Sequence, residues 1–175
     1  MTARTPDVPC VAALPDSAGG ASVRTKPARP RRALDWNAKL RPDMQPRVVT
    51  DRRRGDRLLL PTPLLVAAEL LAVPAGRTLT MSQLRARLAL RHDADRTCPL
   101  MTGMFAKIIA GAVADDLDHQ RTERWPIWRL VGDDGCISRD WPLDALYRAT
   151  RLRAEGVKLG RKGDHWQVLE PGIAA

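Results

Sequence analysis

The chain has 175 residues, which suits one domain or a smaller domain with a tail and argues against a large multidomain enzyme. Its 29 Lys and Arg outweigh 20 Asp and Glu, and the formal net charge of +9 favours polyanionic partners such as nucleic acid or an acidic membrane surface. Three cysteines, Cys10, Cys98 and Cys136, are too few for a disulfide framework, so we expect a cytoplasmic protein. The apolar stretches are shorter than the roughly 20 residues of a membrane span, and no membrane partner is expected.

Charge and apolar content change near Arg57. Residues 1–57 are rich in Pro and Arg and carry few large apolar side chains, so they cannot bury enough surface to offset the entropy lost on ordering. We therefore expect a disordered basic tail over residues 1–57 and a folded domain over residues 58–175. Residues 29–32 and 52–54 each hold three arginines, which either contact phosphates without sequence preference or belong to a solvated linker without a partner.

Caps and helix-breaking residues mark the first helix of the folded domain. Thr62 followed by Pro63 predicts its start, and the Pro-Ala-Gly sequence at residues 74–76 predicts its end. One face carries the apolar residues that would point to the core, namely Leu64, Leu65, Ala68, Leu71 and Ala72.

A short extended piece and a second helix come next. Residues 77–80 predict the extended piece. Thr80 or Ser82 is then expected to cap a helix that runs to about Arg91. The apolar residues of this helix share one face and are Leu84, Leu88 and Ala89.

A third, long helix is predicted after a loop over residues 92–100, with Thr102 as its cap. Its buried stripe is expected to consist of Phe105, Ile108, Ile109, Ala112, Val113 and Leu117. Three aspartates between residues 115 and 118 oppose the helix dipole and repel phosphate. If this helix meets DNA, it must therefore do so with its N-terminal end.

The last third of the folded domain predicts a hairpin and a final helix. Residues 127–131 and 136–138 are expected to form the two strands of a β-hairpin around a Gly-Asp-Asp-Gly turn. Residues 143–155 predict a helix closed by Gly156, and a short strand follows at residues 166–169. We therefore expect a mostly α fold with a small β-hairpin, a winged helix-turn-helix DNA-binding domain preceded by the tail. The same order also fits a winged helix that binds protein.

Neither a metal site nor a cofactor motif stands out. Metal sites need closely spaced donors, whereas the three histidines, His92, His119 and His165, lie far apart in the sequence. The chain lacks a serine hydrolase elbow, a phosphate-binding glycine loop and a dinucleotide fingerprint, so we expect no cofactor and no metal. Asp133 and Asp134 lie between glycines and are interpreted as turn formers.

Three motifs together resemble a known family. They are Pro-Ile-Trp-Arg-Leu-Val at residues 126–131, Asp-Gly at 134–135, and Leu-Arg-Ala-Glu-Gly-Val at 152–157. This pattern resembles the DNA-binding, active-site domain of alkylguanine-DNA alkyltransferases and of their alkyltransferase-like relatives. In that family a Pro-Cys-His-Arg-Val segment precedes an Asp-Gly hairpin and a closing Leu-x-x-Glu-Gly helix. The resemblance extends back through residues 80–88 and 97–105, and it covers about residues 60–158.

The departures from this pattern decide the expected chemistry. The nucleophilic cysteine of the family falls on Ile127 and its activating histidine on Trp128, while Pro126, Arg129 and Val131 match. A hydrocarbon side chain cannot accept an alkyl group, so the resemblance predicts no catalytic residue. The carboxylate that orients the histidine in the family corresponds to Glu155. The resemblance thus implies a non-reactive base pocket formed by Pro126, Ile127, Trp128 and Glu155.

The resemblance also suggests DNA contacts. The tyrosine that rotates a nucleotide in the family corresponds to Met81, and the arginine that fills the vacated space has no counterpart at residues 101–104. The expected DNA-binding residues are Met81, Ser82, Thr102, Lys107 and Arg129. Trp125, Trp128 and Trp141 lie near the lost cysteine in sequence, and they would either stack on an extruded base or pack the wing against the helices.

The sequence therefore predicts a non-catalytic DNA-binding protein of the alkyltransferase-like type, which recognises alkylated bases in DNA repair. Its expected partners are double-stranded DNA and other repair proteins, and it is expected to be a monomer. One alternative is a divergent methylated-DNA-protein cysteine methyltransferase that uses Cys136 or Cys98. The other is a winged-helix regulatory module that binds protein.

Overall fold

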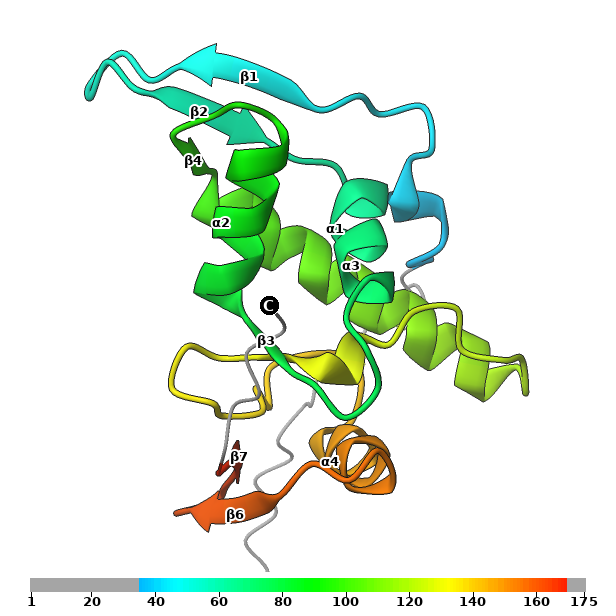
Figure 1. Ribbon diagram of the computed structural model, residues 1–175. Helices are drawn as coiled ribbons and strands as arrows, with labels where there is room; N and C mark the ends of the chain where they lie inside the picture. Colours follow the sequence, from blue (N-terminus) through cyan, green and yellow to red (C-terminus); the bar gives the residue numbers. More distant parts are fainter. Residues whose placement is uncertain (1–34, 170–175) are drawn as a thin grey trace, which may run out of the picture. The chain divides into compact units, whose positions relative to one another are not determined.

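The computed structural model describes residues 35–169, which contain four α-helices and three small sheets (Figure 1). The helices are α1 (Pro63–Leu71), α2 (Met81–Arg91), α3 (Pro99–Asp118) and α4 (Ala145–Ala154), with 3-10 turns η1 (Ala38–Leu40) and η2 (Ile127–Arg129). The strands are β1 (Arg47–Thr50), β2 (Arg57–Leu60), β3 (Leu79–Thr80), β4 (Arg96–Thr97), β5 (Leu130–Val131), β6 (Leu159–Lys162) and β7 (His165–Val168). Residues 1–34, with most of the expected tail, lie outside the described residues.

The predicted helix caps are found at three of the four helices. Thr62 accepts a hydrogen bond from the Leu65 N–H at 3.2 Å, with Pro63 as the first helical residue of α1. The Thr80 side chain caps α2 in a reciprocal arrangement with Gln83, at 3.2 and 2.9 Å. The α4 helix ends before Gly156, which has a φ of +83° as predicted, but it begins at Ala145 rather than at residue 143, with Asp144 as an N-cap that is not predicted from sequence.

The start of α3 was predicted incorrectly. The helix begins at Pro99, and Cys98 rather than Thr102 occupies the N-cap position. Proline suits the first helical position because its missing N–H has no partner there in any helix. Thr102 lies one turn inside, is fully buried, and donates its hydroxyl to the Cys98 carbonyl at 2.8 Å.

The buried face of α1 is the opposite of the predicted one. Leu64 and Leu71 are exposed by 38% and 58%, whereas Val66 and Leu70 have no exposed surface. The helix is apolar on most of its circumference, so the pattern alone does not distinguish the core face. Glu69 also lies on the buried face, where its carboxylate pairs with Arg91 of α2 at 2.8 Å.

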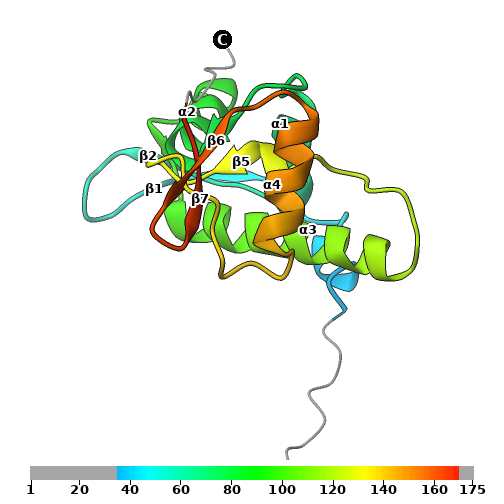
Figure 2. The same cartoon turned by 90° about the horizontal axis from the view of Figure 1, so that it is seen from below.

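The three sheets join parts of the chain that are distant in sequence. β2 pairs antiparallel with β1 and parallel with β4, β3 pairs parallel with β5, and β6 pairs antiparallel with β7. In Figure 2, the β6–β7 hairpin lies beside α4.

The hairpin predicted from residues 127–138 is therefore wrong. Its turn does form, since the Gly132 N–H donates to the Cys136 carbonyl at 2.9 Å, but β5 pairs with β3 and Cys136 bridges to Gln167 of β7. Leu130 and Val131 are both buried, and burial on both faces is typical of a strand in a parallel pair.

Residues 35–57 are folded, which differs from the expected tail boundary at residue 57. The Trp36 ring packs against Gly111 of α3, and Leu40 is buried in the core. Further along, Arg96 of β4 forms salt bridges with two aspartates of the β1–β2 turn. A few specific contacts of this kind order a segment whose overall composition resembles a disordered one.

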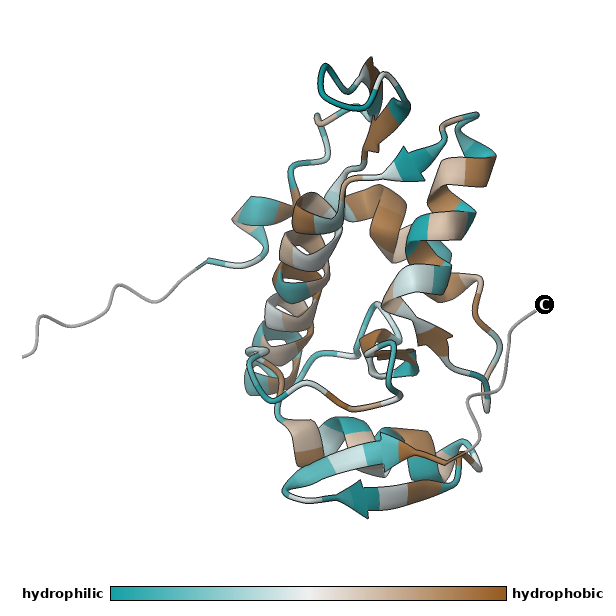
Figure 3. Cartoon of the chain, turned by 90° about the vertical axis from the view of Figure 1, so that its left-hand side faces the viewer, coloured by the Kyte–Doolittle hydropathy of each residue, from teal (hydrophilic) through white to brown (hydrophobic). Residues whose placement is uncertain are grey.

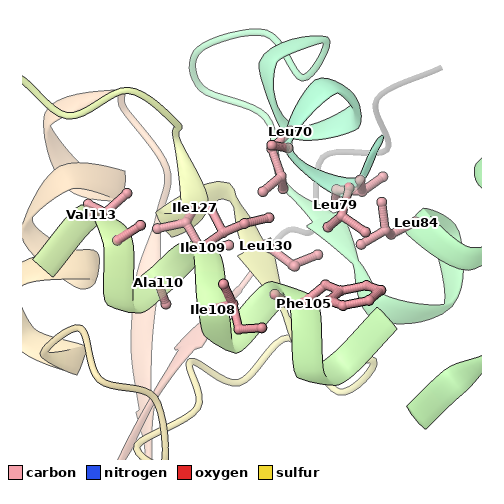
Figure 4. Packing of buried hydrophobic residues seen from close by; sticks show 14 of the residues in the cluster. Leu70, Leu79, Leu84, Phe105, Ile108, Ile109, Ala110, Val113, Ile127 and Leu130 are labelled. Carbon is pink, nitrogen blue, oxygen red and sulfur yellow. The ribbon is translucent and has the colours of Figure 1, made fainter. Parts of the chain in front are cut away.

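The main core surrounds α3. Figure 4 shows Phe105, Ile108 and Ile109 of this helix among leucines from α1, β3 and α2, with Ile127 and Leu130 close by. The predicted α3 stripe is thus confirmed for most of its members. In Figure 3, apolar residues recur along the helices, and the turn of the β1–β2 hairpin carries hydrophilic residues. Among the described residues, no helix is both long and apolar enough to span a bilayer.

Candidate nucleic-acid interface

The segment that resembles the family active site is buried. Ile127, at the position of the lost cysteine, has no exposed surface, and Figure 4 shows it packed beside Ile109 and Leu130. Trp128 is 4% exposed and Pro126 is also buried. The structure does bring the four predicted base-pocket residues together, because Trp128 reaches Glu155 of the segment after α4. These four residues pack as part of the protein interior, and the Ile127 side chain occupies the position of the family cysteine.

Glu155 accepts hydrogen bonds from three parts of the chain. Trp128 donates its indole N–H to Oε1 at 2.7 Å, and Arg129 donates Nε and Nη2 at 2.9–3.1 Å. The Gly76 N–H donates to Oε2 at 3.1 Å. Burial by itself would raise the pKa of Glu155, but the bonds from Arg129, Trp128 and Gly76 outweigh it and lower the pKa. Glu155 is therefore ionised, and both of its carboxylate oxygens accept hydrogen bonds that hold the fold together. Its role is structural, and it does not serve as a general base.

The Arg129 side chain points into the protein. Its donors reach Glu155 and, through Nη1 at 2.5 Å, the Val73 carbonyl at the end of α1. Only 15% of the side chain is exposed. The guanidinium of Arg129 thus joins η2, the end of α1 and the end of α4, whereas the sequence predicts it as a DNA contact.

Each of the three tryptophans near the lost cysteine has an arginine on its ring. The Arg124 guanidinium lies 4.3 Å from the Trp125 ring centroid, and Arg148 and Arg151 lie at 4.2 and 4.4 Å from Trp141 and Trp128. These contacts favour the packing interpretation of the tryptophans over base stacking. Arg148, which is fully buried, also donates to the carbonyls of residues 130 and 138, a role that no sequence signal indicated.

Two of the predicted DNA contacts lie at the N-terminal end of α2. Met81 is half-buried and packs against the core, while Ser82 is exposed. Ser82 donates its N–H and its hydroxyl to the Asp133 carboxylate, at 2.7 and 2.6 Å. Burial opposes ionisation of Asp133, but the bonds from Ser82 lower its pKa overall. An aspartate thus occupies the place where a phosphate would bind at this helix end, and Ser82 is not a free phosphate donor.

The other two predicted contacts lie on α3 and differ from each other. Thr102 is buried, and its hydroxyl donates to the Cys98 carbonyl, so the structure does not present this side chain at the surface. Lys107 is exposed and lines a cavity of about 450 Å³ between α3 and η1. Two further cations, Lys39 and Arg41, line the same cavity together with Trp36.

Trp36, Lys39 and Arg41, which lie in or next to η1, are not among the residues predicted from sequence, because they fall in the expected tail. A tryptophan among basic residues was the available signal. The cavity places three cations and an indole ring on one side of α3, an arrangement that suits phosphate and base contacts.

Cys136 lies in a smaller cavity of about 290 Å³, and His165 lines it too. Burial and the hydrogen bond with Asp134 raise the pKa of the Cys136 thiol, so the reactive thiolate is disfavoured. Over residues 35–169, no three histidine, cysteine or acidic side chains gather into a metal site. No sequence pattern indicates that Cys136 and His165 line one cavity, because His165 of β7 is 29 residues from Cys136 in the chain.

No protein-family model matches the chain, and no curated protein is significantly similar to it. Two solved structures do match. S. pombe Atl1 in complex with damaged DNA containing O6-carboxymethylguanine is 17% identical with a TM-score of 0.44, over 61% of this chain and 86% of that chain. S. pombe ATL in complex with DNA is 18% identical with a TM-score of 0.40, over 62% of this chain and 88% of that chain.

Proposed function

We propose that this protein is a non-catalytic DNA-binding protein of the alkyltransferase-like type, which recognises alkylated duplex DNA without repairing it. The observation that carries the proposal is the buried Ile127 at the position of the family nucleophile, beside a Glu155 that Trp128 and Arg129 fully engage. The segment keeps the family's Pro, Arg and Glu positions but uses them to hold the fold together. A scaffold of this kind can bind a duplex without accepting a group from it.

Charge supports duplex DNA as the partner. The excess of basic residues over the whole chain is nine, and Lys39, Arg41 and Lys107 gather on the side of α3 that faces η1. In this proposal, α3 approaches DNA with its N-terminal half, because its C-terminal turns carry aspartates. The β6–β7 hairpin, with Arg161 and Lys162, serves as the wing of a winged-helix arrangement.

One observation favours a second candidate function, a divergent cysteine alkyltransferase. Cys136 and His165 line the same cavity, and a thiol beside an imidazole is the usual arrangement of a cysteine nucleophile. The raised pKa of Cys136 argues against it, and Asp134 rather than His165 is the group that bonds the thiol. We therefore rank this function second.

A titration with matched duplexes tests the proposal. The full-length protein is mixed with plain and O6-alkylguanine duplexes at two salt concentrations, and intact masses are recorded after long incubation. We expect binding that weakens steeply as salt rises, tighter binding to the alkylated duplex, and no change in protein mass.

Each other outcome has a distinct meaning. A mass increase equal to the alkyl group, lost in a Cys136→Ser variant, would establish the alkyltransferase function. Equal affinity for the two duplexes would remove damage recognition and leave general DNA binding. Absence of any salt-dependent affinity would overturn the proposal in favour of a protein-binding module.

A further inference from the structure

The β1–β2 hairpin presents three arginines at its turn. β1 and β2 pair antiparallel, and residues 51–56 connect them. Arg52, Arg53 and Arg54 all lie exposed in this turn, and no acid of residues 35–169 forms a salt bridge with any of them. These three consecutive arginines are the longest run of basic residues in the described sequence, and Arg54 also interacts electrostatically with Asp56.

The acids of the same turn are used elsewhere. Asp51 and Asp56 both pair with Arg96 of β4, whose Nε lies 2.5 Å from an Asp56 carboxylate oxygen. Hydrogen bonds from the Arg53 backbone and from Arg96 lower the pKa of Asp51, and the bond from Arg96 lowers the pKa of Asp56. Both carboxylates therefore stay ionised and directed toward β4, which leaves residues 52–54 as the outward face of the turn.

The backbone of the turn is held in one conformation. The Arg53 N–H donates to the Asp51 side chain at 2.9 Å, and the Gly55 N–H donates to the Asp51 carbonyl at 2.7 Å. Gly55 has a φ of +74°, which a glycine adopts without strain. Because the loop is already ordered, a ligand that binds the three arginines loses little binding free energy to the conformational entropy of this loop.

The hairpin is joined directly to the start of α3. β2 pairs with β4, Leu58 opposite Arg96 and Leu59 opposite Thr97, and the Cys98 N–H donates to the Leu59 carbonyl at 2.9 Å. α3 begins at the next residue. Figure 1 shows β2 beside β4, with the turn of the hairpin extending past them. The arginine turn therefore lies near the N-terminal, positive end of the α3 dipole, whereas the first aspartate of the C-terminal turns, Asp115, is about 24 Å further along the helix at 1.5 Å of rise per residue.

We propose that residues 52–54 bind the phosphate backbone of duplex DNA next to the N-terminal end of α3, as a second wing built from β1 and β2. A guanidinium group can donate two parallel hydrogen bonds to the oxygens of one phosphate. Such contacts increase the affinity for DNA without selecting a base sequence. The inference rests on the proposed function and deepens it, since it assigns a surface to the DNA that the whole molecule is proposed to bind.

Charge-removing and charge-keeping variants of the full chain test this assignment. A triple variant with Arg52→Gln, Arg53→Gln and Arg54→Gln is compared with the corresponding triple Lys variant and with wild type. Affinity for a plain duplex is measured by fluorescence anisotropy at several salt concentrations. We expect the Gln variant to lower the slope of log affinity against log salt by about 0.9 per lost contact, up to about 2.7 in all. The Lys variant should keep the wild-type slope.

A matched single change controls for net charge. Arg53→Gln is compared with Arg121→Gln, which lies just beyond the C-terminal end of α3 and whose partner Asp116 keeps Arg124 at 2.9 Å. We expect a slope reduction for Arg53→Gln alone. The melting temperature of each variant is measured in parallel, and we expect it to stay at the wild-type value because residues 52–54 are exposed and form no salt bridge with an acid of residues 35–169.

The possible failures are distinguishable. If wild type binds duplex DNA and the triple Gln variant binds with the same slope, the second wing is overturned while the proposed function stands. If Arg53→Gln and Arg121→Gln weaken binding equally, net charge explains the effect and the wing is again overturned. If wild type does not bind duplex DNA, both proposals fall together.

Discussion

Glu155 shows how one side chain can change its role while keeping its position. The family resemblance predicts this carboxylate from sequence, as the group that orients a histidine. With Trp128 in place of the histidine, the indole N–H donates to Oε1 of Glu155 at 2.7 Å. What sequence could not predict is that Arg129, the matching arginine, turns inward to the same carboxylate, because its partners in the fold come from 56 and 26 residues away.

Removal of Arg129 is expected to weaken the fold rather than DNA binding alone. After Arg129→Ala, the ionised and largely buried Glu155 keeps only the hydrogen bonds from Trp128 and Gly76. The Val73 carbonyl loses its hydrogen bond from Arg129. We expect the free energy of unfolding at pH 7 to fall by about 2–3 kcal/mol, measured by urea denaturation.

The pH dependence of this loss has a definite sign. The pKa of Glu155 is lowered in the folded state, so its stabilising effect is present above the unfolded value of about 4.3 and is lost as pH falls through the folded value. The difference between wild type and Arg129→Ala should therefore be largest above about pH 5 and shrink in acid. Arg139→Ala, at an exposed position, serves as the control with little effect. A difference that does not change with pH would contradict the Glu155 assignment.

At the scale of elements, sequence predicted what is local and missed what is distant. Thr62, Thr80 and Gly156 mark helix ends through bonds or backbone angles within a few residues, so their patterns are readable. The pairing of β5 with β3 depends on residues about fifty positions apart, and two-residue strands carry no local signal for it. The arrangement around the candidate site follows from such distant pairings, and that part required the structure.

Two glycines of α3 provide a matched test of how η1 is held. A Cβ at Gly111 would overlap the Trp36 ring, whereas a Cβ at Gly103 would meet nothing within 4 Å. Gly111→Ala should displace Trp36 and destabilise the protein by about 1–2 kcal/mol, even after the helix gain of alanine. Gly103→Ala should instead stabilise it by about 0.5–1 kcal/mol. Thermal unfolding of both variants checks these signs, and equal shifts would mean that Trp36 does not pack on α3.

For the whole molecule, composition placed the start of the fold about twenty residues too late. The charge change near Arg57 is real, but residues 35–57 contribute Trp36, Leu40 and β1 to the folded unit. The average hydropathy of a segment does not reveal that a single tryptophan packs on α3 or that two aspartates pair with Arg96. The same segment supplies the cations beside Lys107, so the missed boundary also hid part of the candidate interface.

Two shortened chains test this boundary. A chain that starts at Leu58 loses η1, β1 and both partners of Arg96, and it uncovers the α3 surface under Trp36. We expect it to be less stable than a chain starting at Leu34 by about 3 kcal/mol or more, from one buried leucine and one packed indole. Melting temperatures at equal concentration give the comparison. Identical values would show that residues 34–57 add nothing to the fold.

The parallel pairing of β2 with β4 and of β3 with β5 also bears on how the chain acquires its structure. These pairs close loops of about forty and fifty residues. The chain loses conformational entropy when each loop closes, before the strand contacts can stabilise the closed state. The β1–β2 turn and the individual helices need no such closure. We therefore expect the helices and the β1–β2 hairpin to form within microseconds and the two parallel pairings to form in a slower step.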